Sequence, residues 1–381
     1  MRSEQALPTA VSRSRIAAID RLRGLVMLLM LVDHTREFFF IGHQVSDPMD
    51  LTTTSPALAA TRLAAHLCAP IFVALTGLAA WLYGAGKPTS AVSAFLLKRG
   101  AFLILLEVTL VNFAWTFALP PTLLYLQVIW AIGIAMLVLA GLVHLPRGWI
   151  ATIGVVIVAG HNLLDPIAIP PGMPGHAAWA VLHDRGFIDL GGALRARTSY
   201  PVLPWIGAIA LGYAAGPWFA AAMKPERRQR LLTITGAAML SGLLILRLVN
   251  GYGDPAGWSV QPTLLGSAIS FLNLTKYPPS LDFLLLTLGI GTVLLAIWDR
   301  RGGGWLAVLG GAPLFFYLLH LYVLHLAHLS AAWISGDPKF EVPSVGWLWA
   351  IAAGLTPPLW WATRWFAGLK RRSTVWWIRY L

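Results

Sequence analysis

The sequence is poor in charged residues, which a water-soluble protein needs on its surface. Charged residues make up 12% of the 381 positions and hydrophobic residues 57%, whereas a soluble domain carries roughly 25% charged residues. The mean hydropathy is +0.69. These values exclude an ordinary soluble domain, so we expect an integral membrane protein surrounded by the lipid bilayer.

Cysteine is almost absent, and histidine is poorly spaced for binding a metal. The single cysteine, Cys68, lies in an apolar run, so a disulfide within the chain and a thiolate-rich metal site are both excluded. His320, His325 and His328 share one segment, but only the last two fall on one face of a helix, where histidine ligands usually sit. We therefore expect no metal cofactor.

A cleavable signal and an internal repeat are also missing. Residues 1–14 are polar and contain neither a short apolar core nor a small-residue cleavage site, so we expect a cytoplasmic N-terminal segment and a first span that is retained. No repeat of the kind that marks many transporters is visible.

Long apolar runs, by contrast, are abundant. A bilayer core of about 30 Å takes about 20 helical residues, and ten segments come close to that length. They lie near residues 16–41, 58–83, 99–119, 123–143, 149–164, 201–222, 230–250, 280–298, 306–328 and 345–367. We predict an all-α bundle of about ten transmembrane helices over residues 15–369, followed by a basic and aromatic cytoplasmic tail at 370–381.

Lysine and arginine are unevenly distributed between the two sides. If the N-terminus is cytoplasmic, most of the 28 basic residues fall in cytoplasmic loops or span ends, as the positive-inside rule requires. Both termini are then cytoplasmic. The net charge of +12 is therefore a topology signal, and we expect no nucleic-acid partner.

The first span ends in four ionisable residues, Asp33, His34, Arg36 and Glu37. With a rise of about 1.5 Å per residue, His34 lies about 21 Å from the cytoplasmic end of its span, and His320 lies at about the same height in the ninth span. Other spans also carry polar groups in their outer halves. Because isolated charges in hydrocarbon are costly, we interpret this layer as a hydrated cavity open to the outer side.

Simpler interpretations exist for several of these groups. Asp33 and His34 could form an interfacial pair at a helix end. His66 and His161 are better interpreted as core histidines with satisfied hydrogen bonds than as functional residues.

Four segments, in this order, carry a resemblance to a known family. They are IDRLRGLVMLLMLVDHTREFF, APIFVALTGLAAWLYG, NLTKYPPSLDFLLLTLG and APLFFYLLHLYVLHL. The chain resembles, from Arg15 to Leu381, the heparan-alpha-glucosaminide N-acetyltransferase-like bacterial membrane proteins, within a wider superfamily of transmembrane acyltransferases.

The resemblance implies transfer of an acyl group, commonly acetyl from cytoplasmic acetyl-CoA, to an acceptor across the membrane. It also implies a catalytic histidine near the outer end of the first conserved helix. Asp20, Arg23 and Gly24 match the D-x-x-R-G motif, and His34 matches the polar position at the end of that helix. In the lysosomal branch the histidine falls later, which makes His43 a competitor.

The chemistry of the residues agrees with such a role. An attacking amine or hydroxyl must lose a proton, and neutral imidazole is a suitable base. Asp33 points about 100° away from His34 on a helix, whereas Glu37 lies on the same side and is a better orienting partner. Asp282 or Glu107, from other helices, are alternatives.

Further candidates follow from their positions. Cationic groups at the cytoplasmic mouth would bind the phosphates of CoA. The candidates for this role are Arg15, Arg21, Arg23, Lys98 and Arg99. The candidates for contacts with the substrate or acceptor are Asp20, Glu107, Lys276, Tyr277, Asp282 and His320.

The leading hypothesis is a multi-pass acyltransferase of the bacterial inner membrane, using acyl-CoA and an extracytoplasmic sugar or other envelope acceptor. The alternative is a proton-coupled transporter that uses the same layer of ionisable groups. The sequence leaves open whether the protein forms a homodimer.

Overall fold

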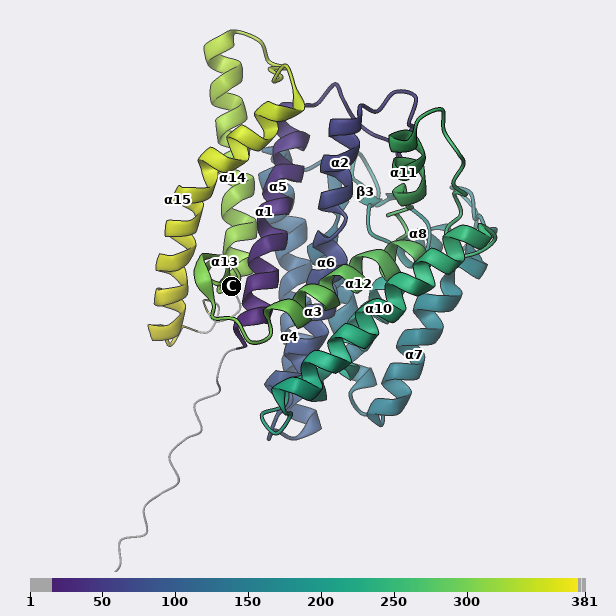
Figure 1. The fold of residues 1–381 in the computed structure, drawn as a ribbon. Coiled ribbons are helices and arrows are strands. Elements are labelled where there is room, and N and C mark those ends of the chain that lie inside the picture. Colours follow the sequence, from purple (N-terminus) through teal and green to yellow (C-terminus); the bar gives the residue numbers. More distant parts are fainter. Residues whose placement is uncertain (1–15, 376–377, 379–381) are drawn as a thin grey trace, which may run out of the picture.

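The protein is a bundle of helices in the computed structural model, which describes residues 16–375 and 378 (Figure 1). The N-terminal segment 1–14 and Arg15, a candidate CoA ligand, lie outside the described residues. The helices of the first half are α1 (Ala17–Phe39), α2 (Pro56–Ala65), α3 (Cys68–Gly84), α4 (Thr89–Leu106), the π-helical η1 (Glu107–Val111), α5 (Asn112–Thr116), α6 (Val128–Leu142), α7 (Arg147–Gly160) and the 3₁₀ turn η2 (His161–Leu164).

The second half continues in the same way. Its helices are α8 (His176–Leu182), α9 (Leu203–Ala214), the 3₁₀ turn η3 (Gly216–Phe219), α10 (Pro225–Val249), α11 (Leu264–Leu272), α12 (Leu281–Trp298), α13 (Gly304–Leu309), α14 (Pro313–Ser335) and α15 (Val345–Arg372). In the bundle α10 packs on α12, α4 on α6, α3 on α9, and α1 on both α13 and α14.

Five helical segments of the described chain are long and apolar enough to cross a membrane. They are Pro56–Gly84, Arg147–Leu164, Pro225–Val249, Leu281–Trp298 and Pro313–Ser335. In α10 only 22% of an apolar stretch of 18 residues is buried inside the protein. Most of its apolar side chains therefore face outward, as they would toward lipid. The beginning of α1 and the end of α15 lie at the same end of the bundle (Figure 1). The ten-span topology with cytoplasmic termini stays a prediction.

Several predicted spans are broken in the structure. The segment predicted at 58–83 is divided into α2 and α3 by a turn at His66 and Leu67. Pro70 has no N–H to donate to the carbonyl of His66, so a regular helix cannot run through this point with all its hydrogen bonds. The segment predicted at 306–328 is divided in the same manner, because α13 ends at Leu309 and Pro313 begins α14.

A small sheet accompanies the helices of the predicted all-α bundle. Its strands β1 (Leu123–Leu126), β2 (Gly186–Asp189) and β3 (Arg195–Thr198) lie in the order β1-β3-β2, with β1 parallel and β2 antiparallel to β3. Residues 123–126 were predicted to begin a helix. Instead the Asn112 side chain donates to the oxygen of Leu123 and accepts from the N–H of Tyr125, and β3 supplies the remaining backbone partners.

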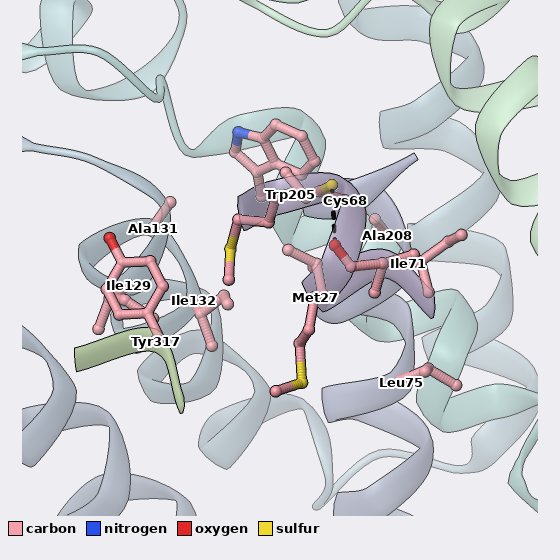
Figure 2. Packing of buried hydrophobic residues seen from close by; sticks show 14 of the residues in the cluster. Met27, Cys68, Ile71, Leu75, Ile129, Ala131, Ile132, Trp205, Ala208 and Tyr317 are labelled. Carbon is pink, nitrogen blue, oxygen red and sulfur yellow. Dashed lines mark hydrogen bonds between the residues drawn. The ribbon is translucent and has the colours of Figure 1, made fainter. Parts of the chain in front are cut away.

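The core lies around α1, between α3, α6, α9 and α14. Figure 2 shows Met27 of α1 near Cys68 and Trp205, with Tyr317 beside Ile129 in the same cluster. The Cys68 thiol donates to the carbonyl of Val26 at 3.2 Å. This thiol is therefore a packed internal group of the α1–α3 contact.

Two glycines allow α1 and α13 to approach backbone to backbone. A Cβ atom built on Gly24 would lie 1.9 Å from the carbonyl oxygen of Leu306, and one on Gly310 would lie 2.0 Å from that of Asp20. Close approach through small residues is typical of helix pairs in membranes. The glycine of the D-x-x-R-G motif therefore has a packing function, which places α1 against the segment leading into α14.

Replacing Gly24 by alanine should push these two backbones apart. We expect Gly24→Ala to lower the free energy of unfolding by about 1–3 kcal/mol, the usual cost of overpacking, because a backbone oxygen cannot rotate away. Gly141→Ala is the matched control, since no atom of the described residues is found within 4 Å of the added methyl group there. Thermal unfolding in detergent micelles measures both variants, and equal midpoints would contradict this account.

Candidate functional site

Two histidines from distant parts of the chain form a direct pair. Nδ1 of His34 on α1 lies 2.7 Å from Nε2 of His320 on α14. Their rings are nearly parallel, at 10°, with centroids 5.0 Å apart. That separation exceeds the ~3.5–4.0 Å of stacked carbon atoms in contact, so the rings meet edge to edge through a hydrogen bond. The equal heights predicted for these two residues agree with this contact.

The neighbouring carbonyl fixes the direction of this hydrogen bond. Nδ1 of His320 lies 2.8 Å from the carbonyl oxygen of Phe316, and a carbonyl only accepts, so this nitrogen carries the proton. In a neutral ring Nε2 of His320 is then the acceptor, and Nδ1 of His34 donates to it. The remaining nitrogen of His34, Nε2, is left with a free lone pair, as a base or nucleophile requires.

Aromatic residues surround the pair on the side of the bundle interior. Trp115 lies against His34 with ring centroids 5.0 Å apart, and Tyr317 lies 6.0 Å from His34 and 5.7 Å from His320. The Tyr317 hydroxyl and the Trp115 Nε1 atom are buried and face each other without forming a well-aligned hydrogen bond. Because burying an unpaired donor is costly, these groups suggest a polar ligand atom beside His34.

Asp33, next to His34, is surrounded by cations. Its Oδ1 lies 3.4 Å from Nε of Arg36 and 3.5 Å from NH1 of Arg62, and its Oδ2 lies 4.0 Å from Nζ of Lys276. The three cationic side chains are buried, at 2%, 8% and 3% exposed. One carboxylate thus offsets three buried positive charges, so Asp33 has a structural role.

Glu37 does not orient His34 in the structure, contrary to the sequence-based interpretation. Its carboxylate pairs with Arg36, the neighbouring residue. The partner of His34 is His320, because the edge of the imidazole faces α14 and not the next turn of α1. Glu37 lies at the partly exposed end of the ion-pair network that begins at Asp33.

Glu107 and Asp282 do not bind His34 either. The π-helical turn η1 turns Glu107 toward the first turn of α6, where its Oε2 accepts from the N–H of Trp130 at 2.9 Å. Asp282 lies in the first turn of α12 against Gly253, whose carbonyl accepts from the Asp282 N–H. One oxygen of Glu107 is therefore occupied by a local contact, whereas Oε1 of Glu107 and Oδ1 of Asp282 are buried without a hydrogen-bond partner among the described residues.

His43 lies apart from this pair. Its side chain is 56% exposed, its Nδ1 is 3.3 Å from Oε2 of Glu341, and its ring stacks on Phe40. It belongs to the loop after α1, where it joins the segment before α15. The structure thus gives His34, and not His43, the enclosed surroundings.

Lys276 and Tyr277 are held by the loop that follows α1. The Asp47 carboxylate accepts from the backbone N–H of Lys276 at 3.1 Å and of Tyr277 at 2.8 Å. Burial raises the pKa of Asp47 above its ordinary value, and the charges of Arg62 and Lys276 offset part of this effect. Tyr277 also donates to the hydroxyl of Tyr200 at 3.1 Å. Both candidates therefore lie at the end of the bundle where His34 lies.

A cavity of about 430 Å³ lies among α1, α3, α4, α6, α14 and α15. Neither His34 nor His320 is among its lining residues, but Tyr317, whose ring lies beside both histidines, is one of them. The size of the cavity falls within the roughly 300–1,000 Å³ that is usual for ligand sites. Tyr317 lines its inner part, and Arg23, Arg99 and Arg371 line the basic part. The remaining walls are mostly apolar, and they include aromatic residues: Phe72, Tyr83 and Phe95.

Of the candidate CoA ligands that the structure describes, two line the cavity and two do not. Arg23 and Arg99 line the cavity. Arg21 donates to the carbonyl of Gly303 at 2.8 Å, and Lys98 is exposed at the surface of α4. Asp20, a substrate candidate, is buried and forms an ion pair with Arg23 at 3.5 Å.

Sequence reasoning missed three residues at this cavity. Lys370 and Arg371, from the end of α15, line its basic part, and Tyr317 lines its inner part. The basic run at 370–372 was interpreted only as part of the tail, although α15 continues through it to Arg372. A tyrosine one turn before His320 was the available signal for Tyr317, since i and i+3 share a helix face.

Comparison with known families agrees with this site. The family described as heparan-alpha-glucosaminide N-acetyltransferase, catalytic, matches residues 15–246. The chain belongs to this family. The matched region contains His34, Arg23, Arg99 and the walls contributed by α3, α4 and α6, while α14, with His320 and Tyr317, follows it. No curated protein matches the chain significantly.

Membership and structure together place the protein among membrane-associated acetyltransferase-type enzymes. They give no support to the transporter alternative.

Neutralising Asp33 should destabilise the fold. Asp33→Asn keeps the shape of the side chain but leaves Arg36, Arg62 and Lys276 without their shared counter-charge, so we expect a loss of about 3 kcal/mol in unfolding free energy, as for other broken buried pairs. Asp189→Asn is the control with the same chemical change, because Asp189 is 85% exposed in its pair with Arg195. Thermal unfolding in detergent should separate the variants, and an unchanged midpoint for Asp33→Asn would refute the role given to this carboxylate.

Proposed function

We propose that the protein transfers an acetyl group from cytoplasmic acetyl-CoA to an amine or hydroxyl of an extracytoplasmic sugar or envelope component in the bacterial inner membrane. The observation that carries this proposal is the cavity with basic residues at one end and Tyr317, in contact with His34 and His320, at the other. A ligand with phosphates at one end and a reactive acyl group at the other fits a cavity that is basic at one end and mostly apolar toward Tyr317.

The basic end of the cavity would bind the nucleotide part of CoA. Guanidinium groups bind phosphate oxygens bidentately, and Arg23, Arg99 and Arg371 come from three different helices. The apolar walls then suit the pantetheine arm and the acetyl group. Bound in this direction, the thioester would approach Tyr317 and His34.

His34 would act as the base. As the acceptor oxygen or nitrogen forms its bond to the thioester carbon, its proton passes to Nε2 of His34; the C–S bond then breaks, and the CoA thiolate takes up the proton. The hydrogen bond from Nδ1 of His34 to His320 orients the ring throughout, and it strengthens when the ring carries positive charge.

Tyr317 would stabilise the negative charge on the thioester oxygen. Its hydroxyl is buried beside the Trp115 Nε1 atom, it lines the cavity, and its ring touches both histidines. A donor that is already in place costs little reorganisation when charge develops in the transition state. The acceptor would enter from the other end of the bundle, near Lys276 and Tyr277.

Binding of CoA at the basic end is directly testable. We expect acetyl-CoA to raise the thermal unfolding midpoint of the protein, since a ligand at 100 times its Kd stabilises the folded state by about 2.7 kcal/mol. Arg99→Gln combined with Arg371→Gln should reduce the shift, whereas Arg195→Gln, on the surface of β3, should not. Absence of a shift at saturating acetyl-CoA, or equal shifts in all three proteins, would count against the proposed cavity.

The base is tested by CoA release. Purified protein in detergent with acetyl-CoA and glucosamine as the acceptor probe should liberate free thiol, and His34→Ala should slow this by about 10²–10⁴-fold, the usual contribution of a general base. His43→Ala should release thiol at nearly the normal rate. If both variants turn over normally the mechanism is wrong, and if only His43→Ala is inactive the role belongs to His43.

A further inference from the structure

A second group of histidines lies outside the cavity, where η2 meets the end of α8. His161 begins η2, Asp165 follows its last residue, and His183 caps the C-terminus of α8. One possible ligand atom from each residue can be chosen so that all three lie within 4.8 Å of one another. His161 and His183 are buried, and Asp165 is partly buried.

His161 lacks the partners that a core histidine needs. It is 2% exposed, and neither of its ring nitrogens has a hydrogen-bond partner among the described residues. In the neutral ring one nitrogen carries a proton and the other a lone pair, and burial leaves both unsatisfied. Buried polar groups are satisfied almost without exception, so an orphaned imidazole calls for a missing partner. The sequence-based interpretation of His161 as a satisfied core histidine is therefore wrong.

The other two residues are already oriented toward a common point. Oδ1 of Asp165 lies 3.4 Å from Nε2 of His183, and Nδ1 of His183 lies 3.5 Å from Oδ1 of Asp184. Nδ1 of His183 forms no hydrogen bond of good geometry among the described residues, although the Asp184 carboxylate lies close to it, where a supporting carboxylate of a metal-binding imidazole usually lies. Nε2 of His183 also lies 3.0 Å from the carbonyl oxygen of His161, a contact that would be exchanged for the metal.

Asn162 fixes the third ligand. Its amide nitrogen donates to Oδ2 of Asp165 at 2.8 Å, which leaves Oδ1 directed toward His183. The oxygen of the same amide accepts from the N–H of Leu281, the first residue of α12. The arrangement is thus braced by a hydrogen bond to a third helix.

We propose that His161, Asp165 and His183 bind a zinc ion. Two imidazoles and one carboxylate form a common zinc ligand set, with a water molecule or a further ligand in the remaining tetrahedral position. The imidazoles favour zinc over magnesium or calcium, which prefer oxygen ligands. The ion would tie η2 to α8 and so fix the beginning of the segment at 165–200, which carries β2 and β3. This site is separate from His34 and does not depend on the acyl-transfer proposal.

Metal content and cobalt binding test the proposal. The full-length protein, freed of any polyhistidine tag, is purified in detergent and its zinc is measured by atomic emission. Chelated protein is then titrated with Co²⁺, whose visible absorption reports tetrahedral coordination. The variants are His161→Ala, His183→Ala and the milder Asp165→Asn. His144→Ala is the control, because His144 is exposed and lies in the loop between α6 and α7.

The expected result is about one zinc ion per chain in the wild type and in His144→Ala, with a visible cobalt spectrum. In the three ligand variants we expect affinity for cobalt to fall by at least about tenfold. Wild-type protein that retains no zinc and gives no cobalt spectrum would overturn the proposal. So would ligand variants that bind as tightly as His144→Ala. If the histidine variants do not fold, the wild-type titration and Asp165→Asn still decide the question.

Discussion

The hydrogen bond between His34 and His320 is the interaction on which the proposed site depends. Inside a bundle that faces lipid, polar groups must find their partners within the protein, because no bulk water is available to them. The two imidazoles satisfy each other, and the carbonyl of Phe316 sets the direction of their bond. This arrangement requires α1 and α14 to lie at a fixed distance and register, which the glycine contact between α1 and α13 provides. The same helix, α1, therefore carries both the glycine that packs against α13 and the histidine proposed as the base.

The bundle separates two kinds of polar groups along its length. Next to His34 on α1, Asp33 and the cations around it form a network in which charges offset one another. At the opposite end, Arg23, Arg99 and Arg371 line a cavity instead. Arg23 is paired with Asp20 there, so ion pairing occurs at both ends of the bundle. Cations that line a cavity attract an anionic ligand, and this is the physical reason for placing the CoA phosphates at the end of the bundle where Arg371 lies.

Much of the architecture could be predicted from apolar runs, because a lipid-facing helix needs a length and a composition that sequence displays directly. The interruptions were harder to predict. The break at His66 depends on Pro70, and the strand at 123–126 depends on the Asn112 side chain and on β3, which lies about seventy residues away. For the candidate site, too, one part could be predicted from the sequence and another could not. Heights along helices indicated that His34 and His320 could meet, but the rotation of each helix decided that Glu37 turns to Arg36 and Glu107 to Trp130.

The sequence by itself determined that the chain belongs in a membrane, that α1 carries a motif followed by ionisable groups, and that the family is one of acetyltransferases. These conclusions depend on composition and on short-range order, which the chain carries before it folds. Only the tertiary structure decided which groups meet. It brought Tyr317 to the cavity and gathered Arg371 with Arg23. It also left the buried ring of His161, beside His183 and Asp165, without a hydrogen-bond partner in the part of the chain that the structure describes. Each of these outcomes depends on helix rotation and crossing, and those are set by packing between segments that are distant in sequence.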